Sequence, residues 1–476
     1  MRVPSQTSFA SSAVSLRLSL KAGACQGPPI VAASTSLRFL SRSGSWDGTV
    51  IRSLEVNRMN IIVPHAAALD VHKKTITACV RTPDGRGGRA EQVRTFPTFL
   101  DGLVDLRGWL LVEGVTQVAM EATSSYWLPV WRVLEDDDVF NRLLLVNARH
   151  VRHVPGRKTD VKDASWLCQL LEVGLLAGSF VPPPDVRRLR AVTRYRKRLI
   201  QARTAEIQRV EKTLEDAVIK LGAVASKTLT KSGRAMLEAL IAGQRDPTVL
   251  ADLAMGRLRA KIPDLLRALD GRFDGHHAVH LRQLLDHIDW FEATIATLDD
   301  RIVDLTAPWG DLLDRLCTIP GVGRRTAEVI IAETGGDMTP WPTAAHLASW
   351  AGMSPGHHES GGKRRSGRTT TGDVWLADAL TEAAWSAVRA RDTYMAAKFW
   401  RIAGPRATGN RKKKAAIAVG HKILIAAYYI TATPGEVYRD LGGDYFTRRD
   451  DPDRRRTRLI AQLADLGYHV ELTPAA

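Results

Sequence analysis

"HAAALDV", residues 65–71, opens the part of the sequence that decides the fold. It is followed by "TITACVRT" (75–82) and, after a glycine-rich turn at 84–88, by "EQVRTF" (91–96), which together predict three successive strands. Two more apolar strands follow, "VTQVAMEA" (115–122) and "RLLLVNAR" (142–149), separated by segments of helical length and spacing. This order of elements predicts an α/β layer fold.

Four acids stand at the ends of these elements. Asp70 ends the first strand, Glu121 ends the fourth, and Asp160 and Asp163 begin a helix after the fifth, in "KTDVKDA" (158–164). Such carboxylates can converge on Mg²⁺ (or Mn²⁺), which prefers oxygen ligands and leaves positions for water and phosphate. The alternative is that each acid is a helix cap or a solvated strand end. The coincidence of all four, in the arrangement of the ribonuclease-H-like (RuvC-like) nucleases, favours a metal site.

The charge of the chain indicates a polyanionic partner. The net charge is +16 and the pI is about 9.9, which favours nucleic acid first and an anionic membrane surface second. We find no apolar run long enough to span a bilayer. Cys25, Cys79, Cys168 and Cys317 form no CxxC pair, which argues against a zinc ribbon or a disulfide framework and favours a reducing cytoplasm.

Residues 1–58 differ from the rest of the chain. They hold twelve serines and seven Lys or Arg, with Asp47 and Glu55 as their acids. This composition matches a transit peptide, but we favour a disordered or non-native extension, with Met59 as the true start. The remaining residues keep a net charge of +11, so the expectation of a nucleic-acid partner does not depend on this segment.

Residues 183–308 are predicted to be helical, with a coiled-coil seam in two segments. Such helices could pair within one chain or between two chains, and the seam alone does not distinguish these. The seam positions of the first segment are Ile207, Val210, Leu214, Ala217 and Leu221. Those of the second are Leu281, Leu284, Ile288, Phe291, Ile295, Leu298, Ile302 and Leu305.

Residues 309–432 carry two further motifs, and residues 433–476 form a basic tail. In "LCTIPGVGRRTAEVIIAETGG" (316–336), the Gly321-Val-Gly323 turn is typical of a helix-hairpin-helix element that binds phosphate, with Arg324 and Arg325 following. The alternative is a glycine-permitted turn inside a helical bundle. The second motif is a glycine-rich, basic loop in residues 349–373, followed by an apolar helix. The candidate nucleic-acid contacts are Arg157, Lys158, Gly321, Gly323, Arg324, Arg325, Lys363, Arg364, Arg365 and Arg368.

Together these motifs resemble a known family. "ALDVHKK", "MEATSSYW", "KTDVKDA", "IPGVGRRTA", "WAGMSP" and "SGGKRRSG" occur in this order, as in the DEDD transposases of the IS110 (IS-one-ten) insertion-sequence family. The resemblance covers about residues 64–430. Relatives usually have Gly-Asn where this chain has Gly372 and Asp373, which puts a local DNA or RNA contact in doubt.

The resemblance implies a RuvC-like DEDD domain (59–182), a coiled coil (183–308) and a transposase domain (309–432) with a nucleophilic serine, Ser360. It implies a homo-oligomer that recombines DNA under the guidance of a bridge RNA, through a phosphoserine intermediate. Two alternatives stay open. One is a RuvC-like nuclease or Holliday junction resolvase that uses metal-activated water, and the other is a nucleic-acid-binding protein without catalytic activity.

Overall fold

The computed structural model describes residues 60–147, 160–356, 358–366, 368–406, 408–449 and 452–473. The predicted extension at residues 1–58 lies outside this part of the chain. For residues 160–162, 358, 360, 364–366, 452 and 455, only the backbone is described. The described residues form two compact units, one of residues 60–143 and 160–176, and one of residues 144–147 and 177–473.

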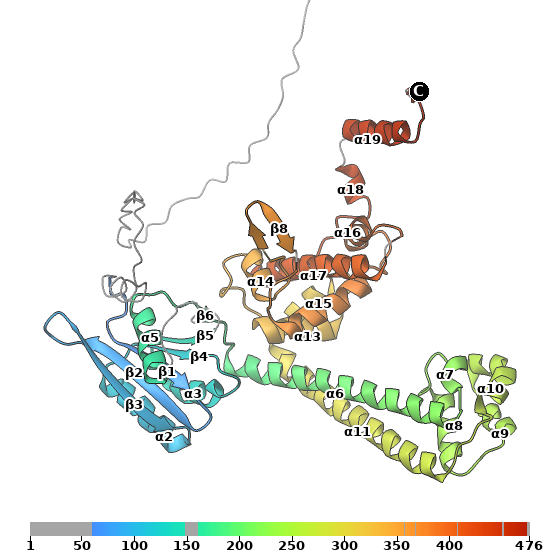
Figure 1. Ribbon diagram of the computed structural model, residues 1–476, viewed down its shortest axis with the longest axis horizontal. Coiled ribbons are helices and arrows are strands. Elements are labelled where there is room, and N and C mark those ends of the chain that lie inside the picture. The colour runs from blue at the N-terminus through green and yellow to red at the C-terminus, as the bar shows by residue number, and fades with distance from the viewer. Residues whose placement is uncertain are drawn as a thin grey trace, which may run out of the picture. The chain divides into compact units, whose positions relative to one another are not determined.

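A mixed sheet with the order β3-β2-β1-β4-β5-β6 organises the N-terminal region (Figure 1). β1 pairs antiparallel with β2 and parallel with β4, and β2 pairs antiparallel with β3. Both faces of β1 are buried, which explains its nearly continuous apolar sequence. The strands are β1 (Ala66–Val71), β2 (Thr75–Pro83), β3 (Arg89–Pro97), β4 (Gln117–Glu121), β5 (Arg142–Val146) and β6 (Gly178–Ser179).

Helices cover both faces of this sheet. α5 (Asp160–Glu172) packs across β1, β2 and β4. On the other face, Trp109 of α2 (Leu100–Val112) contacts the ring of Phe96 in a tilted arrangement and lies under the guanidinium of Arg94. α3 (Trp127–Leu134) packs against α2. The predicted order of strands and helices and the α/β character of this region are therefore confirmed.

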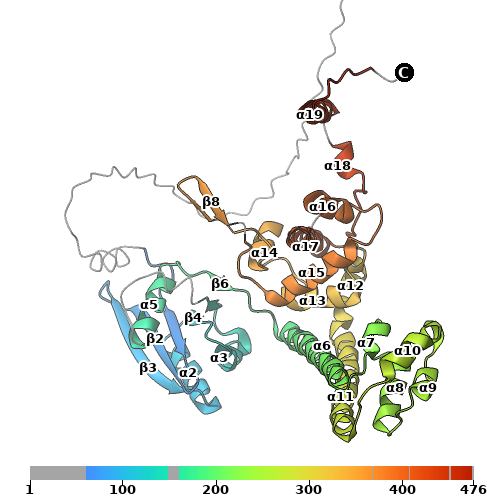
Figure 2. The same ribbon diagram turned by 45° about the vertical axis from the view of Figure 1, so that its right-hand side comes forward.

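Two long helices, α6 (Pro184–Asp216) and α11 (Gly275–Thr306), pack along each other within one chain (Figure 2). Pro184 opens α6 at a position where its missing N–H costs nothing, and a capping box between Asp274 and His277 opens α11. All predicted seam positions of the second segment lie in α11. The first predicted segment runs too far, because α6 ends at Asp216, so Ala217 and Leu221 lie beyond the helix.

The C-terminal end of α6 and the N-terminal end of α11 share an apolar core with four short α-helices and a 3-10 helix. Val210, Leu214 and Leu281 are buried there. Thr230 and Asp246 cap two of these helices with side-chain hydrogen bonds. The elements of this region are α7 (Leu221–Val224), α8 (Lys231–Ile241), α9 (Pro247–Asp252), the 3-10 helix η2 (Gly256–Lys261) and α10 (Ile262–Leu269).

A second apolar core lies among the C-terminal helices, around α17. Among the described helices, α17 alone is long and apolar enough to cross a membrane by length and composition. The expectation that no apolar run is long enough to span a bilayer is therefore wrong for this helix by length and composition, although α17 packs against four neighbouring helices as a core helix does. The helices here are α12 (Gly310–Cys317), α13 (Arg324–Thr334), α14 (Ala344–Trp350), α15 (Val374–Ala387), α16 (Tyr394–Ala403), α17 (Gly409–Ala432), α18 (Tyr445–Arg448) and α19 (Pro452–Asp465).

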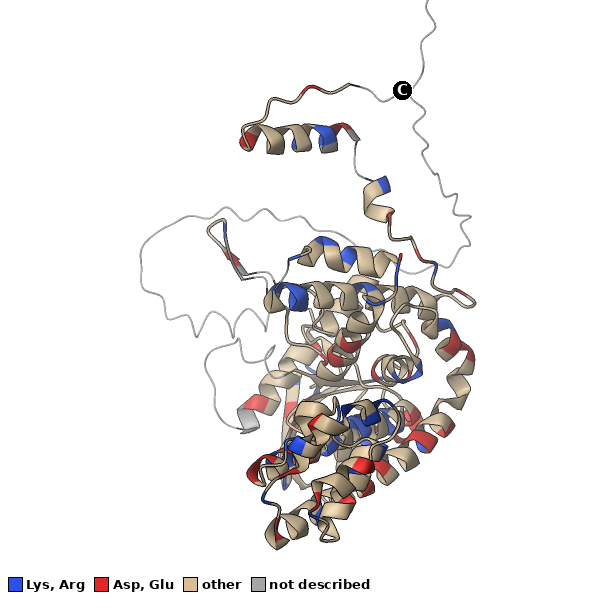
Figure 3. Cartoon of the chain, turned by 90° about the vertical axis from the view of Figure 1, so that its right-hand side faces the viewer, with Lys and Arg blue, Asp and Glu red and all other residues tan. Residues whose placement is uncertain are grey.

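Figure 3 colours the basic and acidic residues of the chain; by sequence, the charged residues of α6 are mainly basic and those of α11 are mainly acidic. Several of them form ion pairs between helices, such as Arg196 with Asp299 and Arg203 with Glu292. Surface pairs of this kind contribute little to stability individually. Some basic side chains of the chain are therefore paired with neighbouring acids, and the net charge of +16 counts only the excess of basic over acidic residues.

Candidate active site

Asp70 and Glu121 occupy equivalent positions on neighbouring parallel strands. The register of β1 and β4 pairs Ala66 with Gln117 and continues to Leu69 with Met120. Asp70 and Glu121 are the next residues of the two strands, and adjacent strands lie about 4.8 Å apart. The two carboxylates therefore leave the carboxyl ends of two adjacent strands side by side.

Both acids lie on the face of the sheet that α5 covers. Side chains alternate along a strand, so Asp70 shares a face with Ala66 and Ala68, and these two pair with Arg81 and Cys79 of β2. α5 contacts this face, because the side chain of Arg81 donates a hydrogen bond to Glu172 of α5 (2.9 Å). Cys168 of α5 also donates a hydrogen bond to the carbonyl of Ala66 (3.4 Å). The parallel register places Glu121 on the same face as Asp70.

The direction of α5 places its first turn at the carboxyl ends of β1 and β4, beside Asp70 and Glu121. Glu172, the last residue of α5, accepts hydrogen bonds through its carbonyl from the N–H groups of Ile62 (2.8 Å) and Val63 (3.0 Å), just before β1. α5 therefore runs opposite to β1. From Cys168 back to Asp160 is about 12 Å of helix, close to the roughly 13 Å of strand from Ala66 to Asp70. The start of α5 is thus level with Asp70.

His72 also lies at this end of the sheet, beside Asp70, and was not among the predicted site residues. Its Nε2 lies 3.2 Å from Oδ2 of Asp70, whose side chain is only 15% exposed. His72 follows Asp70 by two residues, so strand alternation could have indicated that their side chains lie on one face. Asp163 is exposed in the first turn of α5.

The carboxylates suit a hard divalent cation such as Mg²⁺, which prefers oxygen ligands. Among the side chains that the structure describes, no three of the His, Cys, Asp or Glu type form a group that could hold a metal ion. The side chain of Asp160, the fourth predicted acid, lies outside that description. The described part of the site therefore consists of two adjacent carboxylates, with the start of α5 at the same level.

The predicted serine loop is a β-hairpin. β7 (His358–Ser360) and β8 (Lys363–Ser366) pair antiparallel, with Ser360 opposite Lys363. Gly361 and Gly362 form the turn between them, both with positive φ (62° and 74°), as a two-residue hairpin turn requires. Ser360 is consequently the last strand residue before the tip. The Gly-Gly pair was the sequence signal for this turn.

The base of this hairpin is joined by a short ladder of backbone contacts. The N–H of Gly356 donates to the carbonyl of Arg368 (2.9 Å), and the N–H of Thr370 donates to the carbonyl of Ser354 (3.3 Å). Gly352 and Gly372 meet at the end of the ladder, each in contact with the backbone of the other. The two backbone segments that lead to the hairpin, one before it and one after it, are therefore held together between residues 352 and 372.

A buried ion cluster anchors the residue that follows this ladder. Asp373 caps α15 by accepting hydrogen bonds from the N–H groups of Trp375 and Leu376 (2.9 Å each), and its carboxylate lies 3.1 Å from Nη2 of Arg194. Arg194 also donates to Glu333, which is fully buried. Burial raises the pKa of Glu333, and the hydrogen bonds from Arg194 oppose this shift. Asp373 thus has a defined structural role in this chain.

The glycine turn at 321–323 joins α12 to α13, and its assignment as a helix-hairpin-helix element stays a prediction. Gly321 has φ 85°, and a Cβ there would lie 2.2 Å from the carbonyl oxygen of Ala383 in α15. Packing against α15 therefore requires glycine here, whatever the turn binds. Arg324 pairs with Glu328 (3.4 Å) and Arg325 with Asp299 (3.0 Å), so both predicted phosphate contacts have acidic partners. A role toward phosphate stays a prediction.

The other predicted nucleic-acid contacts fall into two groups. Lys363, in β8 of the hairpin, and Arg368, in the ladder at its base, are exposed. Arg157 and Lys158 lie outside the described residues, and the side chains of Ser360, Arg364 and Arg365 do as well.

Comparison with known proteins assigns this architecture to a class of DNA transposases. A model of the DEDD transposases of IS110, described as "Transposase", matches residues 67–219. A second, described as "Transposase IS116/IS110/IS902 family", matches residues 313–401. The two matches together cover about half of the chain. The chain belongs to the IS110 family of insertion-sequence transposases.

Similar curated proteins come from several bacteria. A "Probable family 20 transposase" of Pseudomonas aeruginosa is 28% identical over 277 residues, which are 57% of this chain and 71% of that protein. The "Pilin gene-inverting protein" of Moraxella bovis is 38% identical over 79 residues, 16% of this chain and 24% of that protein. The "Insertion element IS110 uncharacterized 43.6 kDa protein" of Streptomyces coelicolor is 56% identical over 46 residues, 10% of this chain and 11% of that protein.

Proposed function

We propose that this transposase cuts and rejoins DNA through a phosphoserine intermediate formed by Ser360, with Asp70, Glu121, Asp160 and Asp163 as a metal site. The observation that carries the proposal is that the carboxyl ends of β1 and β4 and the start of α5 lie at the same end of the sheet. A RuvC-like fold of residues 59–182, a coiled coil of residues 183–308 and a transposase domain of residues 309–432 belong to the same proposal.

The four acids would hold Mg²⁺ or Mn²⁺ through their carboxylate oxygens. The bound ion supplies polarisation of a phosphodiester and stabilisation of the charge that develops on it. The protein contributes the placement of the ligands, because Asp70 and Glu121 lie at the carboxyl ends of β1 and β4, two adjacent inner strands of the sheet. His72 holds one oxygen of Asp70 and so restricts the rotation of that carboxylate.

Ser360 would act as the nucleophile. Its Oγ forms a bond to phosphorus, its proton passes to a base, and the bond from phosphorus to one DNA oxygen breaks, so that a protein-linked strand and a free hydroxyl result. The phosphoserine conserves the energy of the phosphodiester for rejoining. Exposed Lys363 in the hairpin and Arg368 at its base would stabilise the additional negative charge.

A bridge RNA would select the DNA by base pairing, which assigns sequence choice to RNA and strand chemistry to protein. The positive charge of the chain suits both partners. The proposal requires Ser360 and the acids to act on the same phosphodiester, from one chain or from two copies in a homo-oligomer. The site of action would be the bacterial cytoplasm, where the DNA lies.

The test is covalent trapping. The full chain is incubated with Mg²⁺, matched DNA and RNA transcribed from the non-coding DNA that flanks its gene, and protein-linked DNA is resolved on denaturing gels. We expect an adduct with the wild type, none with Ser360→Ala, and an adduct with the loop control Ser354→Ala. Cleavage to free ends, with no linked strand, would instead indicate a nuclease that uses water.

Mixing two inactive variants tests where the two halves of the site come from. If Ser360→Ala and Asp70→Asn chains restore the adduct when combined, the serine and the acids act from different copies. If this mixture stays inactive, while each variant mixed with the wild type forms the adduct, one chain supplies both the serine and the acids.

A further inference from the structure

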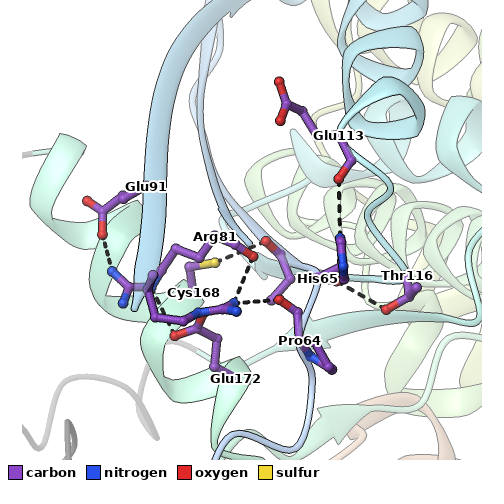
Figure 4. A network of polar contacts seen from close by, with 10 residues as sticks. Pro64, His65, Arg81, Glu91, Glu113, Thr116, Cys168 and Glu172 are labelled. Atoms are coloured by element: carbon purple, nitrogen blue, oxygen red, sulfur yellow. Dashed lines mark hydrogen bonds and ion pairs between the residues drawn. The ribbon is translucent and has the colours of Figure 1, made fainter. Parts of the chain in front are cut away.

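A buried ion cluster lies at the end of α5 remote from the predicted metal ligands. Glu172, only 3% exposed, accepts hydrogen bonds from Nε of Arg81 (2.9 Å) and from Nε of Arg89 (2.9 Å). Arg81 also contacts Glu91, and Figure 4 shows it between the two glutamates. Two guanidinium groups thus face two carboxylates, and the cluster is neutral without a ligand.

The cluster ties α5 to strands that are distant in sequence. Arg81 belongs to β2, and Arg89 and Glu91 belong to β3. Above the cluster, Ser165 of α5 donates to Glu91 (2.8 Å). Together with the backbone bonds from Ile62 and Val63 to Glu172, these contacts fix α5 both along and across the sheet.

We propose that the Arg81–Glu172–Arg89 cluster is a positioning device that sets the register of α5 on the sheet and thereby the place of Asp160 and Asp163 relative to Asp70 and Glu121. The inference rests on the proposed metal site. Asp163 lies about 14 Å along the helix from Glu172, so none of the three cluster residues is itself a ligand. They act through the rigid helix.

A metal site requires one fixed position of α5 along the sheet, whereas stability alone does not. Apolar residues of similar volume often stabilise a buried position as well as an ion pair does, so stability alone does not explain the buried Glu172 and the two largely buried arginines. Charged groups with directional hydrogen bonds do specify one register, whereas an apolar helix face can slide. A slip of one residue moves the helix by about 1.5 Å, and a metal site tolerates only about 0.5 Å.

The test measures Mn²⁺ affinity and thermal unfolding of the full chain and of four variants, of which Glu172→Gln and Leu110→Ala are the main pair. Glu172→Gln keeps the shape of the side chain but removes the charge that holds the two arginines. Leu110→Ala is the control, because Leu110 is fully buried in α2, on the other face of the sheet, and its loss destabilises the same unit without touching α5.

We expect Glu172→Gln to weaken Mn²⁺ binding about tenfold or more while circular dichroism shows a folded chain. Leu110→Ala should lower the unfolding temperature and leave Mn²⁺ affinity unchanged. Arg89→Lys, which keeps the charge but not the planar fork, should fall between wild type and Glu172→Gln.

Three results would overturn the inference in different ways. If Asp70→Asn abolishes Mn²⁺ binding and Glu172→Gln does not change it, the metal site stands and the positioning role is wrong. If the wild type itself binds no Mn²⁺, the proposed metal site fails and the positioning role fails with it. Equal weakening by Glu172→Gln and Leu110→Ala would show that general stability, and not helix register, controls the affinity.

Discussion

Gly372 and Gly352 approach so closely that a Cβ on Gly372 would lie 2.1 Å from the backbone nitrogen of Gly352. Backbone atoms cannot move aside as a flexible side chain can. The contact closes the base of the hairpin that carries Ser360. Only glycine, which has no Cβ, allows the two backbone segments to lie this close, and their contact fixes the direction of the hairpin relative to the helices.

Gly372→Ala should therefore displace the base of the hairpin and reduce recombination strongly. We expect a loss of roughly 1–3 kcal/mol in unfolding free energy, the usual cost of overpacking. Gly409→Ala is the control, because Gly409 begins α17 and a Cβ there meets nothing within 4 Å. Chemical denaturation and the adduct assay would measure both effects, and equal behaviour of the two variants would contradict the prediction.

Asp373 combines a helix cap with an ion pair, and two substitutions separate these roles. Asp373→Asn keeps a good N-cap but removes the charge beside Arg194, whereas Asp373→Ala removes both. We expect the alanine variant to be about 1 kcal/mol less stable than the asparagine variant. Denaturant unfolding checks this difference. If both variants unfold at the same denaturant concentration, the cap does not contribute.

The acids at the strand ends should be required for strand chemistry but not for folding. We expect Asp70→Asn and Glu121→Gln to reduce adduct formation about 10²–10³-fold, because each removes preorganised charge from the site. EDTA should have the same effect on the wild type. Asp105→Asn, an exposed acid of α2, is the matched control and should retain activity. Unchanged activity of the Asp70 variant would exclude the proposed metal site.

The ion pairs of Glu238 should make stability depend on pH in the acidic range. Burial opposes ionisation of Glu238, but hydrogen bonds from Arg282 and Arg234 outweigh it and hold the pKa below the ordinary value of 4.5. A lowered pKa in the folded state means that this contribution is fully present above pH 4.5 and is lost as the pH falls through the folded pKa.

The measurement compares the unfolding free energy of the wild type and of Glu238→Gln from pH 7 to pH 3. The difference between the two proteins should be constant near neutrality and shrink below pH 4.5. A difference that does not change over this range would show that the carboxylate charge contributes nothing. High salt should also reduce the difference, because both partners of the pair are partly exposed.

The sequence by itself determined the order of strands and helices in the N-terminal region and the position of Asp70 and Glu121 at strand ends. These features depend on local periodicity and on the residues that end each element, so a single chain segment contains the information. That residues 281–305 lie in one helix was predictable for the same reason. The end of α6 was not, because the apolar spacing continues from α6 into α7 across the end of the helix.

Only the tertiary structure decided which face of the sheet the acids share, in which direction α5 runs and what holds it there. The residues responsible are far apart in the chain: Arg81 and Glu172 are separated by 91 positions, and Arg194 and Asp373 by 179. Polar contacts at such separations have no periodicity in the sequence, because the partners are brought together only when the strands pair and the helices pack onto them.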